Sequence, residues 1–283
     1  MFNQKIITIK TKTGLTLTAF DGDSITKEIQ SRGEYDGNTL QSIRDVLSLI
    51  KPQMSLDVGA NIGNHAVVIA TLTKKLIAFE PVTFVYDVLK SNLAQNKLGN
   101  AIAVNFGLSL EQSTKKIFIP MNGNLGSSSL EAVDGEGAFL KIDTVSGDAY
   151  LAEHSQTEQI DFIKMDVEGH EAAALIGLQN TIQKYQPLLL LEWKSANTTM
   201  SFKDLDLFNR LFSGYKFYSL SYTSNKKVHP RNWIGFCKRI CNKLTGNTWC
   251  LSSFDSDKSY SNVYFVPERY QNIFLRFNYL EQK

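Results

Sequence analysis

Short apolar segments alternate with longer amphipathic segments along most of this chain, and this alternation restricts the fold more than any other feature. Strands are expected at Met54–Val58, Leu76–Phe79, Ala101–Asn105, Ile160–Met165 and Leu188–Leu191, with helices at Asn64–Leu72, Thr83–Gln95 and His170–Lys184. Strands that are apolar throughout are buried on both faces, because helices cover both sides of a parallel sheet. The pattern predicts an α/β fold with helices on both faces of a parallel sheet.

The N-terminal fifty residues follow a different pattern. Lys5–Phe20 is rich in Thr and Ile with a period of two, which predicts two strands joined by a turn. Thr39–Ile50 carries apolar residues at helical spacing. We therefore expect a β-hairpin and helical cap over residues 1–50, followed by the main domain over residues 51–283.

Two segments of the main domain depart from the alternation. Ile117–Lys141 is rich in Asn, Gly and Ser, and it is expected to be a loop. The last strands are expected at Lys216–Tyr222 and Asn262–Val266. Between them lies a polar, basic insertion around residues 223–258.

Composition excludes several classes of protein. With 43% apolar and 20% charged residues, the chain differs from a disordered protein, which has low hydrophobicity and high net charge. No segment approaches the roughly 18 consecutive apolar residues of a membrane-spanning helix. The N-terminus lacks the apolar core of a secretory signal, and the odd number of cysteines is no disulfide framework, so a cytoplasmic location is expected.

The segment Asp57-Val-Gly-Ala-Asn-Ile-Gly-Asn64 carries the first chemical signal, since it follows one expected strand and opens a helix. Gly59 and Gly63 permit a tight turn and a close approach of a ligand to the backbone. The helix start adds unpaired N–H groups. These features predict a small-ligand site at the carboxyl end of the strand, although two glycines alone fit a plain strand-to-helix turn equally well.

A carboxylate at the end of the next strand strengthens the prediction. Glu80, followed by Pro81, can accept hydrogen bonds from both hydroxyls of a ribose. NAD sites need the pattern G-x-G-x-x-G, but Asn61 stands where the middle glycine would be. Asp57 would repel a diphosphate and suits the ammonium group of a methionine moiety. The charges favour S-adenosylmethionine, with an NAD-dependent oxidoreductase as the alternative.

Three motifs together resemble the FkbM family of methyltransferases, namely Asp57–Gly63, Phe79–Pro81 and Asp161–Glu171. Further family-like positions occur in the same order at Gly33–Asp36, Ser127–Leu130, Ile142–Thr144, Leu191–Glu192 and, more weakly, Tyr264–Pro267. The resemblance covers roughly residues 33–192. It implies a Rossmann-like class I methyltransferase sheet and S-adenosylmethionine-dependent O-methylation of hydroxyls on sugars, polyketides or other metabolites. The cofactor-binding residues that follow from it are Asp57, Gly59, Asn61, Gly63 and Glu80, together with their neighbours Asn64 and Pro81.

Four titratable residues are candidates for the base that removes the acceptor proton. Asp166 ends its expected strand, Glu168 and His170 follow in the next turn, and Glu192 ends the neighbouring strand. Carboxyl ends of parallel strands meet at one edge, so these groups can converge there. Alternatively they only hold the turn or favour the helix start. His65 is a second candidate base, although packing in the cofactor loop is its more ordinary role.

A metal ion is not predicted. Three carboxylates could hold Mg²⁺, but no fixed ligand spacing supports a site. A zinc site formed by His229, Cys237, Cys241 and Cys250 is also rejected, because the spacing lacks the paired cysteines of structural zinc sites.

The stretch Leu207–Phe254 contains eight Lys and Arg residues and no Asp or Glu. Within it, residues 226–244 predict a short amphipathic helix with Lys238, Arg239 and Lys243 on the face opposite its apolar residues. One interpretation is a helix packed on the sheet edge with solvated lysines. The other is peripheral contact with a membrane or an anionic substrate.

The expected function is O-methylation of a sugar hydroxyl, on a bacterial surface glycan, a nucleotide-linked sugar or a glycosylated metabolite. The acceptor is therefore a small molecule or glycan. Nucleic acid is not expected, because Asp166-Val-Glu-Gly169 stands where base methyltransferases carry a Pro-Pro-aromatic turn. A non-catalytic binding module is a further alternative, against which the Asp57 and Glu80 pair argues. The sequence leaves the acceptor and the oligomeric state open.

Overall fold

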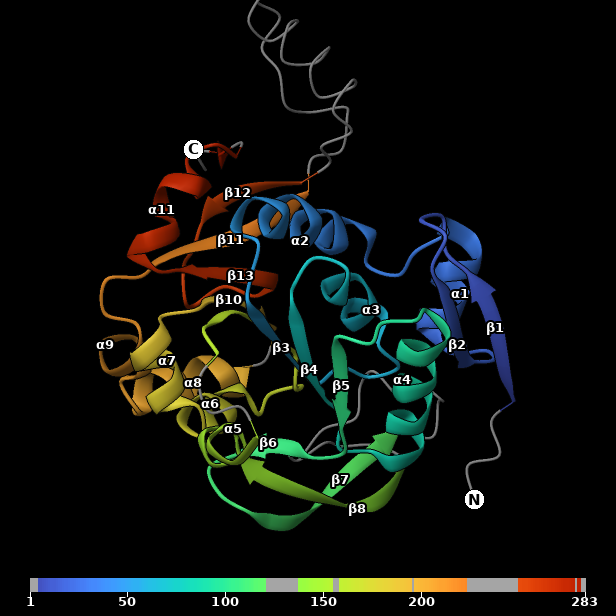
Figure 1. Cartoon of the computed structure of the whole chain (residues 1–283). Coiled ribbons are helices and arrows are strands. Elements are labelled where there is room, and N and C mark those ends of the chain that lie inside the picture. Colours follow the sequence, from blue (N-terminus) through green and yellow to red (C-terminus); the bar gives the residue numbers. More distant parts are fainter. Residues whose placement is uncertain are drawn as a thin grey trace, which may run out of the picture.

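A nine-stranded mixed sheet forms the centre of the molecule in a computed structural model that describes residues 5–120, 137–154, 158–194, 196–222, 249–277 and 279–280 (Figure 1). Its order is β14-β12-β11-β13-β10-β9-β3-β4-β5. The strands are β3 (Met54–Val58), β4 (Lys75–Phe79), β5 (Ala101–Val104), β9 (Ile160–Met165), β10 (Leu188–Trp193), β11 (Lys216–Tyr222), β12 (Trp249–Ser253), β13 (Tyr260–Val266) and β14 (Tyr279–Leu280).

Five of these strands run parallel and alternate with helices along the chain. From β3 the chain moves outward to β4 and β5, and it then returns to the other side of β3 for β9 and β10. The strand order thus reverses beside β3, at the point where open α/β sheets bind their ligands. The predicted α/β fold with a Rossmann-like sheet is confirmed.

Helices pack on both faces of the sheet and divide the core into two apolar clusters. One face carries α2 (Gly37–Ile50), α3 (Asn64–Ala70), α4 (Thr83–Gln95) and α11 (Glu268–Phe274). The opposite face carries α5 (Gly147–His154), α6 (Glu171–Ile176), α7 (Gln179–Tyr185), α8 (Ala196–Asp204) and α9 (Leu207–Leu211). Every residue of β3, β9 and β10 is buried, as expected for strands covered on both sides.

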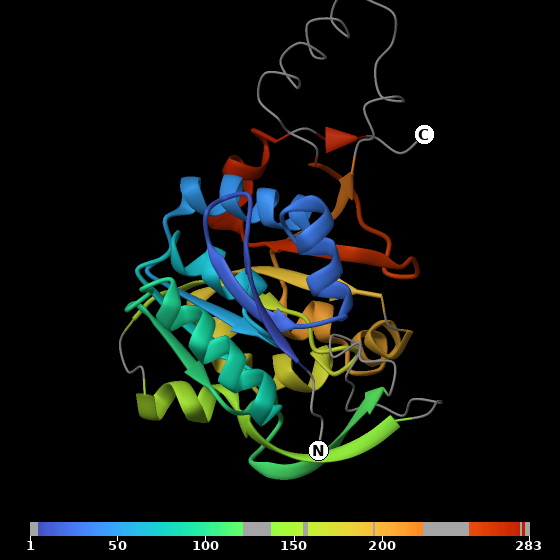
Figure 2. The same ribbon diagram turned by 90° about the vertical axis from the view of Figure 1, so that its right-hand side faces the viewer.

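An N-terminal hairpin docks against α4. Strands β1 (Ile6–Lys10) and β2 (Thr16–Phe20) pair antiparallel and precede α1 (Ser24–Arg32) (Figure 2). Asn92 and Asn96, one turn apart on α4, hydrogen-bond the outer backbone of β2. Each side-chain amide bonds both the N–H and the carbonyl of one threonine, Thr18 for Asn92 and Thr16 for Asn96.

A second, three-stranded sheet lies below the first in Figure 1. It contains β6 (Gly107–Ser109), β7 (Ser113–Pro120) and β8 (Gly137–Ser146). The expectation of a loop over Ile117–Lys141 is wrong at both ends, since β7 and β8 pair there in register from Ser113 to Pro120. The middle of that segment, with Ser127–Ser129, lies outside the described residues.

The helix expected over His170–Lys184 is in fact two helices, α6 and α7. The break falls at Gly177, where an added Cβ would lie 2.0 Å from the carbonyl oxygen of Ser109 on β6. The backbone of the second sheet therefore approaches too closely for a side chain at that position. A contact with residues so distant in the chain leaves no periodic signal in the local sequence.

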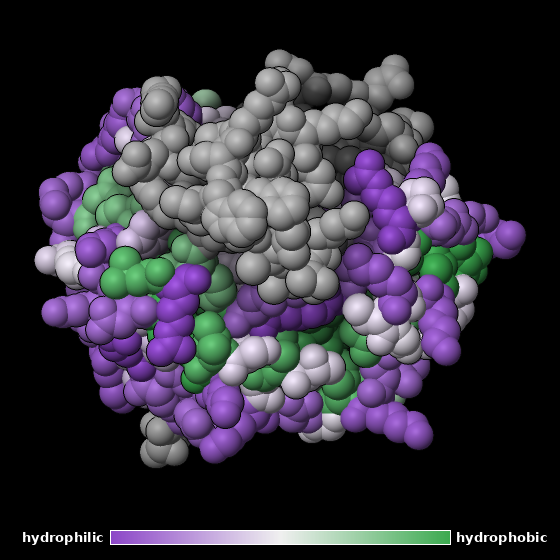
Figure 3. Space-filling model, turned by 90° about the horizontal axis from the view of Figure 1, so that it is seen from above, coloured by the Kyte–Doolittle hydropathy of each residue, from purple (hydrophilic) through white to green (hydrophobic). Residues whose placement is uncertain are grey.

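None of the described helices is long and apolar enough to cross a membrane. Seen from above, the described surface is mostly hydrophilic with smaller hydrophobic areas between (Figure 3). The basic helix predicted for residues 226–244 lies outside the described residues, as do His229, Cys237 and Cys241. The remaining cysteine, Cys250, is buried and free.

Candidate active site

The turn after β3 brings two strand ends into direct contact. Gly59 has a φ of 77°, and a Cβ added there would lie 1.9 Å from the carbonyl oxygen of Asp166. The backbone N–H of Asp166 donates to the carbonyl of Val58 at 3.0 Å, and Gly59 N donates to Phe79 O at 3.0 Å. Only glycine fits this position, and its absent side chain lets the β3 and β9 loops meet.

Glu80 ends β4 and is tied to the turn after β3. One carboxylate oxygen accepts from the N–H of Asn61 at 2.9 Å, and the other accepts from the N–H of Val82 at 2.9 Å. Burial raises the pKa of Glu80 to about 7, although these two N–H groups oppose the rise. Each oxygen retains a free lone pair, so the carboxylate can accept further hydrogen bonds from a bound ligand.

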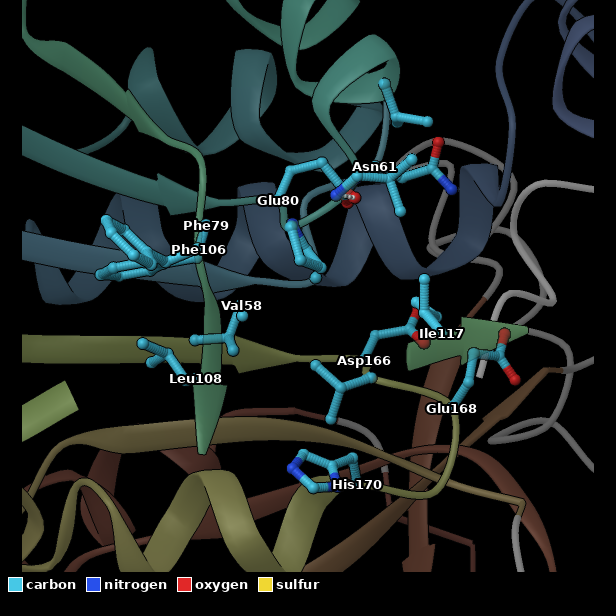
Figure 4. Close-up of a pocket in the computed structure, with 16 residues that line it drawn as sticks. Val58, Asn61, Phe79, Glu80, Phe106, Leu108, Ile117, Asp166, Glu168 and His170 are labelled. Carbon is cyan, nitrogen blue, oxygen red and sulfur yellow. Dashed lines mark hydrogen bonds between the residues drawn. The ribbon is translucent and has the colours of Figure 1, made fainter. Parts of the chain in front are cut away.

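A first pocket lies beside Glu80. Figure 4 shows the rings of Phe79 and Phe106 at one end of it, with Asp166 and Glu168 at the opposite end. The remaining lining is largely apolar and includes Val58, Pro81, Val85 and Leu108. The pocket can therefore take a flat apolar group at one end and a polar or charged group at the other.

Lys164, which sequence reasoning missed, is buried beneath the site on β9. Its Nζ lies 3.5 Å from both Asp57 Oδ1 and Asp166 Oδ2. Burial alone would lower the pKa of Lys164, but the two carboxylates outweigh it and the net pKa is raised. Asp57 is fully buried, forms no hydrogen bond within the described residues and lines neither pocket. Its charge is thus balanced by Lys164.

The loop after β9 is held by Glu171. One carboxylate oxygen of this buried side chain accepts from the N–H groups of Val167 and Gly169 at 3.2 Å, and Thr198 donates to the other at 2.5 Å. Glu168 lies within the loop with a φ of 52°, a left-handed conformation that is costly for a residue with a side chain. Of seven such non-glycine residues in the described chain, Asp36, Asn61 and Glu168 line the pockets.

Three predicted carboxylates converge at the sheet edge. Asp166, Glu168 and Glu192 each bring an oxygen within 4.8 Å of the others. Burial and the charge of Asp166 raise the pKa of Glu168 to about 7, and burial with Asp166 and Glu168 also raises that of Glu192. Lys194 pairs with Glu192. The three oxygens are close enough to hold a metal ion, although Lys164 and Lys194 already supply positive charge there. The absence of a metal ion stays a prediction.

A second pocket of about 930 Å³ adjoins the first. Gly59, Asn61, Asp166 and Glu168 line both pockets. The second pocket is more polar, and its further lining residues come from the N-terminal cap, the start of α3, β9, β10 and β13: Ile25, Glu28, Tyr35, Asp36, Ala60, Asn64, His65, Lys164, Glu192, Lys194, Ser261 and Asn262. The two pockets thus meet at the ends of β3 and β9.

The other predicted residues occupy different positions around this junction. Pro81 lines the first pocket and Asn64 the second. Gly63 lines neither; it precedes α3 and packs against Leu89. His170 lines only the first pocket, with its Nε2 3.1 Å from the hydroxyl of Ser109.

Several lining residues escaped the sequence analysis. Lys164 and Lys194 each lie two residues from a predicted acid, Asp166 and Glu192. A charged residue inside an apolar strand is a signal that could have found Lys164. Tyr35 and Asp36 lie in the family-like segment Gly33–Asp36 but were not predicted as site residues, because the cap reaches the site only through the tertiary fold. Phe106 follows β5, where a single aromatic residue has no distinctive pattern.

A doubly wound sheet with a pocket outside the carboxyl ends of β3 and β4 is the arrangement in which α/β proteins bind small ligands at the switch point. This chain belongs to the FkbM methyltransferase family, because the family model described as the methyltransferase FkbM domain matches residues 57–217. The resemblance inferred from the motifs is confirmed.

The similar proteins include a curated relative and solved structures. The hexuronic acid methyltransferase AglP of Haloferax volcanii is 33% identical over 149 residues, which span 51% of this chain and 59% of that protein. The chain thus matches about three fifths of that relative's length. The crystal structure of methyltransferase FkbM from Methylobacillus flagellatus is 18% identical with a TM-score of 0.44, covering 76% of this chain and 43% of that one. The structure of SMU.1697c from Streptococcus mutans in complex with SAH is 12% identical with a TM-score of 0.41, covering 81% and 97%.

Proposed function

We propose that this protein transfers the methyl group of S-adenosylmethionine to a hydroxyl group of a sugar. One observation carries the proposal: two pockets of different character share a rim formed by Gly59, Asn61, Asp166 and Glu168. A donor in the first pocket and an acceptor in the second would meet at that rim. Membership of the FkbM methyltransferase family supports methyl transfer as the reaction.

The residues of the first pocket fit the donor. Glu80 has free lone pairs for the ribose hydroxyls, and Phe79 and Phe106 offer aromatic faces to the adenine. The acidic end, at Asp166, suits the positive charge of the sulfonium. When bound, S-adenosylmethionine supplies an electrophilic methyl group, so the protein has only to position the acceptor and accept one proton.

Glu168 is the base that we favour among Asp166, Glu168, His170 and Glu192. It lines both pockets, and a pKa of about 7 suits a group that must take up and release a proton near neutral pH. Glu192 lines only the second pocket, and His170 lines only the first. The acceptor oxygen forms a bond to the methyl carbon as the carbon–sulfur bond breaks, and its proton passes to Glu168.

A sugar is the acceptor class that we favour. The second pocket is lined by carboxylates, lysines and amides, which can hydrogen-bond several hydroxyl groups at once. The name of the relative from Haloferax volcanii, a hexuronic acid methyltransferase, supports a carbohydrate.

The test is a methyl-transfer screen with S-adenosylmethionine, read by a mass increase of one methyl group. Nucleotide-linked sugars, isolated polysaccharides and simple polyols are the candidate acceptors, and NAD binding is measured in parallel. Methylation of a carbohydrate supports the proposal. Preferential binding of NAD would favour the oxidoreductase alternative, and donor binding without turnover on any acceptor would favour a non-catalytic module.

A further inference from the structure

We infer that Tyr35, Asp36 and His65 form a subsite for the non-reacting part of the acceptor, so that the N-terminal cap determines which sugar is methylated. The inference rests on the proposed function, because it assigns acceptor recognition within the second pocket. It concerns residues that lie away from the methyl donor and from the carboxylates at the strand ends.

The cap contributes to the second pocket only. Its lining residues come from α1 and from the turn before α2, and they are Ile25, Glu28, Tyr35 and Asp36. Among the described residues of the cap, from residue 5 onward, none lines the first pocket. A substitution in the cap can therefore alter acceptor binding without touching the donor site.

The turn that carries Tyr35 and Asp36 is fixed to the main domain on two sides. The side-chain amide of Asn64 donates to the carbonyl of Tyr35 at 3.2 Å. On the other side, Asn262 donates to the hydroxyl of Thr39 at 3.1 Å. Such anchoring holds the side chains of the turn in place before a ligand arrives, which lowers the entropic cost of binding.

Asp36 and His65 face each other across the pocket wall. His65 Nε2 lies 3.5 Å from Asp36 Oδ2 and has no hydrogen-bond partner among the described residues, although only 9% of its side chain is exposed. Asp36 precedes α2, yet its side chain does not cap the helix backbone. A buried ring nitrogen and a neighbouring carboxylate with spare hydrogen-bonding capacity are suited to a ligand that both donates and accepts, as adjacent sugar hydroxyls do.

The charge states of these groups agree with such a role. Burial alone would raise the pKa of Asp36, but the nearby His65 ring and the Thr39 hydroxyl outweigh it and hold the pKa below its usual value. Burial and the charges of Asp166 and Asp36 raise the pKa of Tyr35 to about 12. At neutral pH the subsite therefore offers an ionised carboxylate acceptor beside a protonated phenol.

The experiment compares Asp36→Asn, His65→Gln and Tyr35→Phe with the wild-type chain. The probes are methyl glucoside, methyl galactoside, methyl mannoside and methyl glucuronoside, each assayed with S-adenosylmethionine. Asp21→Asn is the matched control, since it removes the same charge from the hairpin, where the side chain of Asp21 is 44% exposed and forms an ion pair with Lys5. Thermal melting verifies that each variant folds.

For the sugar that the wild-type enzyme uses best, loss of a charged hydrogen bond should raise KM about 10- to 100-fold in Asp36→Asn. The kcat should change less than about threefold, and the donor Kd should stay within about twofold. The ranking of the four sugars should also change in the subsite variants and stay unchanged in Asp21→Asn.

Two results would overturn the inference while the proposed function stands. One is an unchanged KM and an unchanged sugar ranking in all three folded variants. The other is a loss of kcat by about 10²-fold or more in His65→Gln at constant KM, which would identify His65 as the base instead. If the wild-type chain binds the donor but neither binds nor methylates any sugar, the proposed function fails and the inference fails with it.

Discussion

Glu80 joins two loops and also faces a pocket. Its oxygens each accept one backbone N–H, from Asn61 and from Val82, and the residue remains only 7% exposed. Stabilising the turn uses one lone pair per oxygen, which leaves the others for the ligand. The same side chain therefore fixes the two loops that border the donor pocket and offers hydrogen-bond acceptors to a ligand in it.

Replacing Glu80 with Ala should weaken donor binding. Removing a charged acceptor costs about 1.5–3 kcal/mol, or roughly 10- to 150-fold in the Kd for S-adenosylmethionine measured by calorimetry. Glu158→Ala, a substitution of an exposed residue near the opposite ends of the strands, is the control. An unchanged Kd in folded Glu80→Ala protein would contradict the assignment of Glu80 to the ribose.

The activity should rise with pH through about 7 if Glu168 is the base. Its pKa of about 7 means that the carboxylate is mostly protonated, and so inactive, at lower pH. Glu168→Gln should lower kcat by about 10²- to 10⁴-fold and abolish this dependence. The check is a pH profile of kcat for both proteins; a profile in Glu168→Gln that keeps the same midpoint would exclude Glu168.

Glu168→Gln should lower the activity but raise the stability of the folded chain above neutral pH. Because the folded-state pKa of Glu168 is raised above the ordinary value of 4.5, the folded chain keeps a proton that the unfolded chain releases between pH 4.5 and 7. The contribution of Glu168 to stability therefore falls as the pH rises through that window. Glu168→Gln should raise the melting temperature at pH 8 relative to wild type, with little change at pH 4.

The acidic residues of this site were predicted from the sequence, but its lysines were not. Glu80, Asp166 and Glu192 each follow or end a short apolar strand, and position in an alternating chain is enough to bring them to one edge. Lys164 was missed although it lies inside such a strand. Its importance depends on Asp57 in the neighbouring strand β3, and pairing across strands is set by the sheet order rather than by local pattern.

At the scale of elements, the close contact between the β3 turn and the β9 loop should make Gly59 intolerant of any side chain. An added Cβ would lie 1.9 Å from the carbonyl oxygen of Asp166, so Gly59→Ala must push the two loops apart. We expect loss of donor binding and a lower melting temperature.

Gly14→Ala is the matched control for that substitution. Gly14 has a similar φ of 88° but no atom within 4 Å of an added Cβ, so it experiences the backbone strain without the collision. Calorimetry and thermal melting of both variants separate the two effects. Equal losses in Gly59→Ala and Gly14→Ala would mean that strain alone matters and that the contact between the loops does not.

The elements themselves were predicted unevenly for a physical reason. Strands β3 and β9 were predicted with their observed bounds, because continuous burial leaves a continuous apolar run. The helices α1, α5, α8, α9 and α11 were not predicted. Each has nine residues or fewer, so an apolar period has few turns over which to recur. The break at Gly177 was missed because its cause lies on another sheet.

At the scale of the whole molecule, the basic stretch predicts attraction to anionic surfaces. The chain carries a net charge of only +2, yet the eight Lys and Arg residues between Leu207 and Phe254 have no acid among them. Lys238, Arg239 and Lys243 lie outside the described residues, so the membrane interpretation rests on sequence alone.

Co-sedimentation with vesicles tests that interpretation. Each Lys or Arg near an anionic surface contributes about 1 kcal/mol, so changing all three to Gln should weaken binding to phosphatidylserine-containing vesicles by roughly 150-fold. Neutral phosphatidylcholine vesicles and added salt are the controls. Binding that ignores lipid charge, or that persists in the triple variant, would contradict a peripheral membrane role.

The docking of β2 against α4 has a consequence for self-association. A two-stranded sheet has two open edges, and an open edge can recruit a strand from another molecule. Asn92 and Asn96 present their amides to Thr18 and Thr16 as a third strand would present its peptide groups. The helix thereby imitates a neighbouring strand and occupies the outer edge of β2, so two side chains, instead of more sheet, close that edge to a strand from another molecule.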